Sequence, residues 1–151
     1  MGTHVSGVGS FILGGGAMSD MKMSDRKMAG PISLMGACAA VPDLWSPRVV
    51  AQVNDQYVKV ARVQGEFPWH QHDNEDEMFL VLKGALTIGR SAEDGGPVTL
   101  APGQMFVVPR GVRHNTSALE ETWIALVETV TTEHTGNEQT AMTRSIAEQL
   151  G

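Results

Sequence analysis

Short apolar stretches, several of them alternating with polar residues, recur along the chain from residue 49 onward. Valine, threonine and aromatic residues favour strands, and the glycine, proline, asparagine or aspartate between the stretches favours turns. The predicted strands cover residues 49–53, 57–64, 78–83, 85–90, 98–101, 105–109 and 122–130. With a histidine-containing segment near residue 70, they make about eight short strands, which predicts an all-β protein built as a closed barrel or as two packed sheets.

Strand pairing and side-chain direction follow in part from this pattern. Gly84 separates residues 78–83 from 85–90 and predicts a tight hairpin between them. In residues 57–64 the alternation leaves open whether Lys59 or Arg62 points inward. An inward cation could bind an anionic substrate, whereas an outward one would be solvated.

Helical periodicity is confined to the C-terminal end. Met142, Ile146 and Leu150 lie at i, i+4 and i+8, and Thr140 is a suitable N-cap. These positions predict one short amphipathic helix, docked on the barrel or on a partner.

Composition divides the chain into three parts. Residues 1–30 contain five methionines and three consecutive glycines without any period, which predicts a flexible N-terminal tail. Residues 31–137 hold the strands and form the predicted β-barrel domain, and residues 138–151 hold the short C-terminal helix. A chain of 151 residues fits one domain with a useful core.

Charge and cysteine content narrow the partners and the compartment. The formal net charge of −6 disfavours nucleic acid, and no apolar run is long enough to cross a bilayer, so neither nucleic acid nor a membrane is expected as a partner. The single cysteine, Cys38, excludes an intramolecular disulfide and suits a cytoplasmic location. Because no base is near it in the sequence, we interpret Cys38 as a small buried residue.

Four residues form a candidate metal site. His70 and His72 are separated by one residue, so on a strand their imidazoles point to the same face and can hold one ion. Glu77 opens the next predicted strand, and His114 follows a Pro-Arg-Gly turn. Glu75 is the competing carboxylate, but it lies within the predicted turn.

Two motifs contain these four residues. The first begins at Gly65 and reads G-x4-H-x-H-x4-E-x6-G, and the second begins at Gly103 and reads G-x5-P-x-G-x2-H. Over residues 45–130 they resemble the paired signatures of the cupin superfamily, and most of all the small single-domain cupins loosely described as similar to mannose-6-phosphate isomerase. The first motif is one residue shorter than usual, and Ala118 stands where the family often has asparagine.

The resemblance implies a double-stranded β-helix, or jelly-roll barrel, with one divalent transition metal per chain. Its ligands would be His70, His72, Glu77 and His114. Three imidazoles and one carboxylate suit iron, manganese, nickel, zinc or copper better than calcium or magnesium, which prefer oxygen. In six-coordinate geometry two positions stay open for a substrate, water or dioxygen.

The surroundings of the motifs predict an apolar pocket. By the two-residue period Phe79 and Val81 share the inward face with Glu77, and Met105 or Val107 could join them. Such a pocket favours a small organic ligand over a sugar phosphate.

Other polar residues near the motifs have less specific roles. Asp73, Glu75 and Asp76 form an acidic loop, which is either solvated or supplies a partner that orients a ligand imidazole. His134 follows the last predicted strand and is expected at the surface.

A metalloenzyme is the function that the resemblance implies most often. Tyr57, Lys59 and Glu66 are candidate bases of undetermined direction, and the lack of a dedicated base favours an iron(II)-dependent dioxygenase. The alternatives are a Lewis-acid isomerase or lyase and a non-catalytic module that binds a small molecule or the metal. By resemblance we also expect a homodimer, with residues 31–50 or the C-terminal helix extending onto the neighbour.

Overall fold

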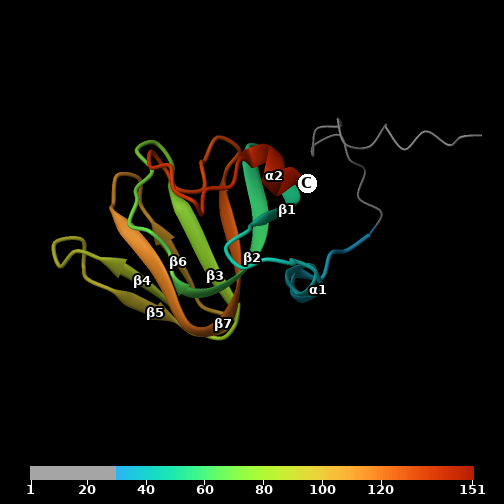
Figure 1. Cartoon of the computed structure of the whole chain (residues 1–151), viewed down its shortest axis with the longest axis horizontal. Helices are drawn as coiled ribbons and strands as arrows, with labels where there is room; N and C mark the ends of the chain where they lie inside the picture. The colour runs from blue at the N-terminus through green and yellow to red at the C-terminus, as the bar shows by residue number, and fades with distance from the viewer. Residues whose placement is uncertain (1–29) are drawn as a thin grey trace, which may run out of the picture.

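Seven strands and two short helices make up residues 30–151, the part of the chain that the computed structural model describes (Figure 1). They are α1 (Leu34–Ala39), β1 (Arg48–Val53), β2 (Gln56–Glu66), β3 (Glu77–Lys83), β4 (Leu86–Arg90), β5 (Val98–Leu100), β6 (Met105–Val108), β7 (His114–Thr129) and α2 (Ile146–Leu150). The all-β prediction is confirmed. The predicted tail, apart from Gly30, lies outside the described residues.

The long strand β7 joins two antiparallel groups of strands. One group runs in the order β1-β2-β7-β3-β6, and in the other β4 pairs with both β5 and β7. The second half of β7 pairs with β3, and its first half, from His114 to Ser117, pairs with β4. Figure 1 shows the strands curving around a common interior, which is the jelly-roll arrangement.

The predicted hairpin at Gly84 is wrong. Strand β3 pairs with β6 and β7, whereas β4 pairs with β5 and β7. At the turn the Ala85 backbone N–H donates to Thr122 Oγ1, and the Thr122 hydroxyl donates to the Ala85 carbonyl. The chain is therefore held against β7 as it leaves β3, and it does not fold back on β3.

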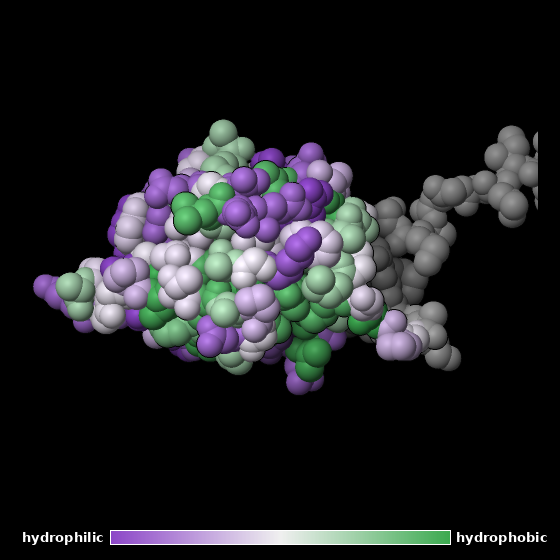
Figure 2. All heavy atoms as spheres, turned by 90° about the horizontal axis from the view of Figure 1, so that it is seen from below, coloured by the Kyte–Doolittle hydropathy of each residue, from purple (hydrophilic) through white to green (hydrophobic). Residues whose placement is uncertain are grey.

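The interior is lined by the alternate residues that the two-residue period selects. Phe79 and Val81 are buried with Glu77, while Met78 and Leu80 are less buried on the outer face. The inward positions of β2, β3, β4 and β7 form the main core, which includes Val63, Phe79, Val81, Leu86, Ile88, Ile124 and Leu126. Figure 2 shows one outer face, where apolar side chains reach the surface between polar ones.

The short helix α1 was not predicted. Ser33 caps it by accepting from the Gly36 backbone N–H at 3.0 Å. Cys38 is fully buried and packs with Val41 and Val60, as predicted for a small buried residue. Burial raises the pKa of its thiol.

The C-terminal helix is present but begins later than predicted. Its N-cap is Ser145, so the prediction of a Thr140 cap is wrong. The Ser145 side chain accepts from the Glu148 backbone N–H, and the Ser145 backbone N–H donates to the Glu148 carboxylate, which makes a capping box. The buried side chain of α2 is Gln149, whereas Ile146 and Leu150 are only half-buried. No helix among residues 30–151 is long and apolar enough to cross a membrane.

Candidate metal centre

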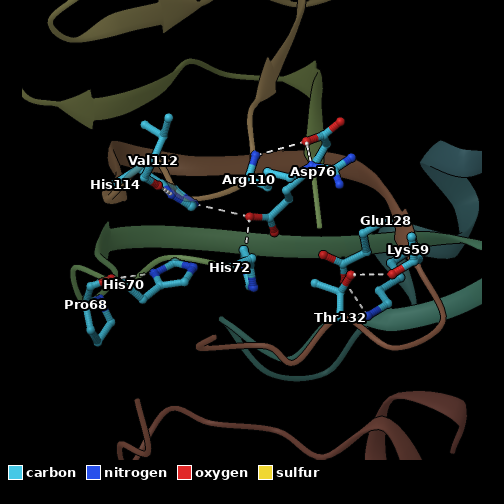
Figure 3. A network of polar contacts seen from close by, with 12 residues as sticks. Lys59, Pro68, His70, His72, Asp76, Arg110, Val112, His114, Glu128 and Thr132 are labelled. Atoms are coloured by element: carbon cyan, nitrogen blue, oxygen red, sulfur yellow. Dashed lines mark hydrogen bonds and ion pairs between the residues drawn. The ribbon is translucent and has the colours of Figure 1, made fainter. Parts of the chain in front are cut away.

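The four predicted metal ligands come together inside the barrel. One candidate ligand atom from each of His70, His72, Glu77 and His114 lies within 4.8 Å of the others. All four residues are buried, each with at most 5% of its surface exposed. In Figure 3 the imidazoles of His70 and His72, from one segment, and that of His114, from another, approach one region.

Backbone pairing places these residues. His70 and His114 exchange two backbone hydrogen bonds of 2.9 Å, and Glu77 is the first residue of β3. The prediction of a regular histidine strand is wrong, because His72 lies outside any strand and its carbonyl accepts from the Gly111 N–H at 2.7 Å. Gly111 has a φ of 78°, a left-handed turn conformation that suits glycine. The pairing between the two segments is therefore regular only at the bridge between His70 and His114.

Local hydrogen bonds prepare two imidazoles for a metal. The Nδ1 of His70 lies 2.9 Å from the Pro68 carbonyl, and the Nδ1 of His114 lies 3.0 Å from the Val112 carbonyl. A carbonyl only accepts, so each Nδ1 carries a proton, and in the neutral ring Nε2 is left as a free lone pair. This is the usual arrangement of histidines that bind a metal, and the donor set fits one.

The acidic loop does not orient these rings. Asp73 accepts from Gln71 and Asn137, and Asp76 pairs with Arg110. Glu75, the competitor of Glu77, accepts from Thr131 at 3.1 Å. Of the two interpretations left open for this loop, the orienting role is therefore not supported, and backbone carbonyls take that role for His70 and His114.

The Glu77 carboxylate lies between two of the imidazoles. Its Oε2 is 3.1 Å from His72 Nε2 and 3.2 Å from His114 Nε2. Because the His114 Nδ1 carries the proton shared with the Val112 carbonyl, a second proton or a metal ion at Nε2 would hold this imidazole beside the carboxylate. Burial alone would raise the pKa of Glu77, but the hydrogen bonds with His114 and His72 outweigh it and hold that pKa well below its usual value.

The pKa values of His70 and His72 are shifted in opposite directions. Burial lowers the pKa of His70 to about 4, so its ring is neutral at neutral pH. Burial also acts to lower the pKa of His72, but its hydrogen bond with Glu77 and that residue's charge more than compensate and raise it. A metal requires neutral imidazoles and an ionised carboxylate, so it would compete with a proton at His72.

A cavity of about 30 Å³ adjoins the cluster, with room for about two water molecules. Its walls are mostly apolar and aromatic, as predicted: Trp45, Pro47, Ala61, Val63, Phe67, Phe79, Ile124 and Leu126. Met105 and Val107 do not contribute, contrary to expectation, since both are exposed on β6. They pair with Leu80 and Met78, and these are outer-face positions of β3.

Comparison with known proteins places the chain in a family. The cupin domain family model matches residues 57–130. The uncharacterised protein YdbB of Bacillus subtilis is 34% identical over 79 residues, which are 52% of this chain and 68% of that protein. A crystal structure of a cupin-2 domain protein from Shewanella frigidimarina is 39% identical, with a TM-score of 0.61, over 65% of this chain and 93% of that one. The chain belongs to the cupin family.

A more distant structure shares the fold. Hydroquinone 1,2-dioxygenase from Sphingomonas sp. TTNP3, solved with 4-hydroxybenzoate bound, is 23% identical with a TM-score of 0.58. The match covers 66% of this cupin and 32% of the dioxygenase chain. The buried cluster of three histidines and one glutamate could bind a metal ion, and we describe the protein as a metal-binding cupin on this basis.

The cavity of this cupin also contains a carboxyl group that the sequence analysis did not single out. Glu128 on β7 lines it and pairs with the inward-facing Lys59, whose Nζ also donates to Gln149 Oε1 at 2.6 Å. Burial and the nearby Glu77 charge raise the pKa of Glu128 to about 7, although Lys59 opposes the shift. Because Lys59 is already paired, an anion-binding role for it is not supported.

Arg62, the alternative inward cation, is half-buried and is also occupied. It donates to Glu121 and to the Val41 carbonyl, both at 2.7 Å. The position of Glu128 could have been found from the two-residue period, because it shares parity with Ile124 and Leu126 on the strand that the sequence predicts.

His134 is half-buried and also lines the cavity, so the expected surface position holds only in part. The segment after β7 folds back over the cluster, and Asn137 donates to Asp73 there. The His134 ring packs on Phe67 with 4.9 Å between ring centroids. Burial lowers its pKa to about 4, so the ring is neutral at neutral pH. No local sequence signal indicates this fold-back.

Proposed function

We propose that this cupin is a small-molecule metalloenzyme in which His70, His72, Glu77 and His114 hold one divalent transition metal. The observation that carries the proposal is their convergence on a mostly apolar cavity. A mixed nitrogen and oxygen donor set suits iron, manganese, nickel, zinc or copper.

The first candidate activity is that of an iron(II)-dependent dioxygenase. Iron with open positions would supply the redox chemistry, while the apolar walls of this chain would exclude water and hold the organic substrate. The shared fold with a dioxygenase is compatible with this candidate. Because the cavity is small, we expect compact substrates such as short diketones or thiols.

The second candidate is a Lewis-acid isomerase or lyase, and Glu128 favours it. The sequence argument for a dioxygenase relied on the lack of a base, yet Glu128 lies in the cavity with a pKa of about 7. A carboxyl group with such a pKa can accept or return a proton at neutral pH. In this candidate Glu128 would move a proton at the carbon next to a substrate carbonyl.

Metal content is the first experiment. Untagged protein, expressed without added metal, is analysed by mass spectrometry beside His70→Ala/His72→Ala and a control, Asn74→Ala, in the exposed loop. We expect about one ion per chain in the wild type and the control, and a loss of more than tenfold in the double variant. Equal metal content in all three proteins, or none in any, would contradict the proposed site.

The two candidate activities are separated by oxygen uptake. Iron-loaded protein that consumes oxygen with a diketone or thiol supports the dioxygenase. Exchange of a substrate proton for deuterium without oxygen uptake, abolished in Glu128→Gln, supports the isomerase or lyase. Tight binding without either reaction would favour a non-catalytic binding module.

We also propose that the chain forms a homodimer in the cytoplasm. In the described structure α1 packs against β2 and β7 and α2 against β1 of the same chain, so exchange of these segments is not needed to cover them. Light scattering at micromolar concentration tests the assembly, and a monomeric mass would contradict it.

A further inference from the structure

A single tautomer of His134 follows from its surroundings. The Arg144 backbone N–H donates to His134 Nδ1 at 3.1 Å. Because Nδ1 accepts, the proton of the neutral ring is on Nε2, which makes Nε2 a donor. Packing against Phe67 restricts the ring further.

His134 Nε2 forms no hydrogen bond with any of residues 30–151, so its donor is unused in the part of the chain that the structure describes. The two other ring N–H groups at the cavity wall are occupied, since Trp45 Nε1 donates to the Gln64 carbonyl and His70 Nδ1 faces that of Pro68.

His134 is part of the lining of two hollows. It lines both the cavity beside the metal cluster and an outer hollow of about 330 Å³. The outer hollow is more polar and also contains Gln139 and Arg144. A molecule between the hollow and the cluster would therefore meet the His134 ring.

The cavity would repel an oxygen-rich substrate without such a donor. Two carboxyl groups, those of Glu77 and Glu128, line it among apolar walls. A substrate oxygen that enters this space loses its hydrogen bonds to water, and an unpaired buried acceptor is costly.

We propose that His134 Nε2–H donates a hydrogen bond to an oxygen of the bound substrate, and so selects compact enolates, hydroxamates or carboxylates over molecules of similar size without a good acceptor. This role rests on the proposed metal site, because the substrate is expected between that site and His134. His134 is then a residue of substrate recognition.

Two substitutions separate the donor from the ring. His134→Phe keeps a flat ring against Phe67 and loses the donor, whereas His134→Gln keeps a donor and loses the ring. Gln139→Ala, an exposed position in the outer hollow, is the matched control. Each protein is loaded with cobalt(II), and its visible spectrum is titrated with acetohydroxamate, which offers oxygen acceptors, or with ethanethiol, whose sulfur is a weak acceptor.

We expect His134→Phe to bind acetohydroxamate about 10- to 100-fold more weakly, with ethanethiol affinity changed less than about threefold. His134→Gln should recover part of the loss, and Gln139→Ala should match the wild type. Equal weakening for both probes, or no weakening in cobalt-loaded His134→Phe, would overturn the role of His134 alone. Failure of the wild type to bind cobalt would overturn the metal site, and the recognition role with it.

Discussion

The two walls of the cavity are held together in different ways. On the metal side, His70 and His114 are each oriented by a carbonyl two residues earlier in the chain. On the Glu128 side, Lys59, which does not itself line the cavity, is fixed by Glu128 and Gln149, which lie 69 and 90 residues away in the sequence. The metal side is thus organised locally, whereas the Glu128 side forms only when β2, β7 and α2 have assembled.

The largest expected effect is a loss of stability when the buried Lys59–Glu128 pair is broken. Lys59→Met leaves Glu128 buried without its cation, and the pKa of Glu128 then rises further because Lys59 no longer opposes the shift. The folded protein must bury either an unpaired carboxylate or a carboxyl group that has taken up a proton, so at pH 8 we expect the free energy of unfolding to fall by about 3–5 kcal/mol. Urea unfolding measures this loss. Lys59→Met/Glu128→Leu removes both charges and should be closer to the wild type, and a double variant as unstable as the single one would contradict the interpretation.

The next effect is the loss of stability in acid that His70 and His134 cause. His70 and His134 have pKa values lowered to about 4, so the folded protein binds fewer protons than the unfolded chain between about pH 6.5 and 4. Their contribution to stability is complete above pH 6.5 and is lost as the pH falls through 4, by up to about 3 kcal/mol for each residue.

The measurement is urea unfolding of metal-free protein across this pH range. His134→Phe should lose roughly half of the histidine contribution. An unchanged pH dependence in this variant would show that His134 is not buried as described.

A smaller effect is expected for the contact between α2 and the barrel. Gln149→Met keeps the volume of the side chain but removes the amide that accepts from Lys59, and should cost about 2 kcal/mol of unfolding free energy. Metal affinity, measured by competition with a chelator, should change less than about threefold, since the ligands are held locally. A large loss of metal affinity would mean that the two walls are coupled.

The smallest effect concerns the helix cap. Ser145→Ala removes one half of the capping box of α2 and should cost about 1 kcal/mol in thermal or urea unfolding. Thr140→Ala, at the position that the sequence favoured as the cap, is the control and should cost less. A larger loss of stability in Thr140→Ala than in Ser145→Ala would support Thr140 as the cap.

The local organisation of the metal side explains why its residues could be predicted. The four candidate ligands lie in two short motifs, and the turns and carbonyls that orient them are part of the same motifs. The partners of Asp73, Glu75 and Asp76 could not be predicted, because several partners were chemically possible for each carboxylate and only the folded backbone decides among them.

The Glu128 side of the cavity could not be predicted in the same way. The role of Lys59 depends on a register between β2 and β7 and on the docking of α2. The first half of β7 was missed because residues such as Asn115, Thr116 and Glu120 are polar and do not resemble a buried strand. The hairpin at Gly84 failed for a related reason, since the long β7 competes for the same edges.

The sharing of β7 between both groups of strands has a consequence for unfolding. Because β2, β3 and β4 all pair with it, neither group can open without disturbing a strand that the other needs. We therefore expect its central amides to exchange with solvent hydrogen only through global opening of the barrel, while the amides of β5 and α2 exchange through local fraying. Exchange rates along this one strand would report the stability of the entire barrel.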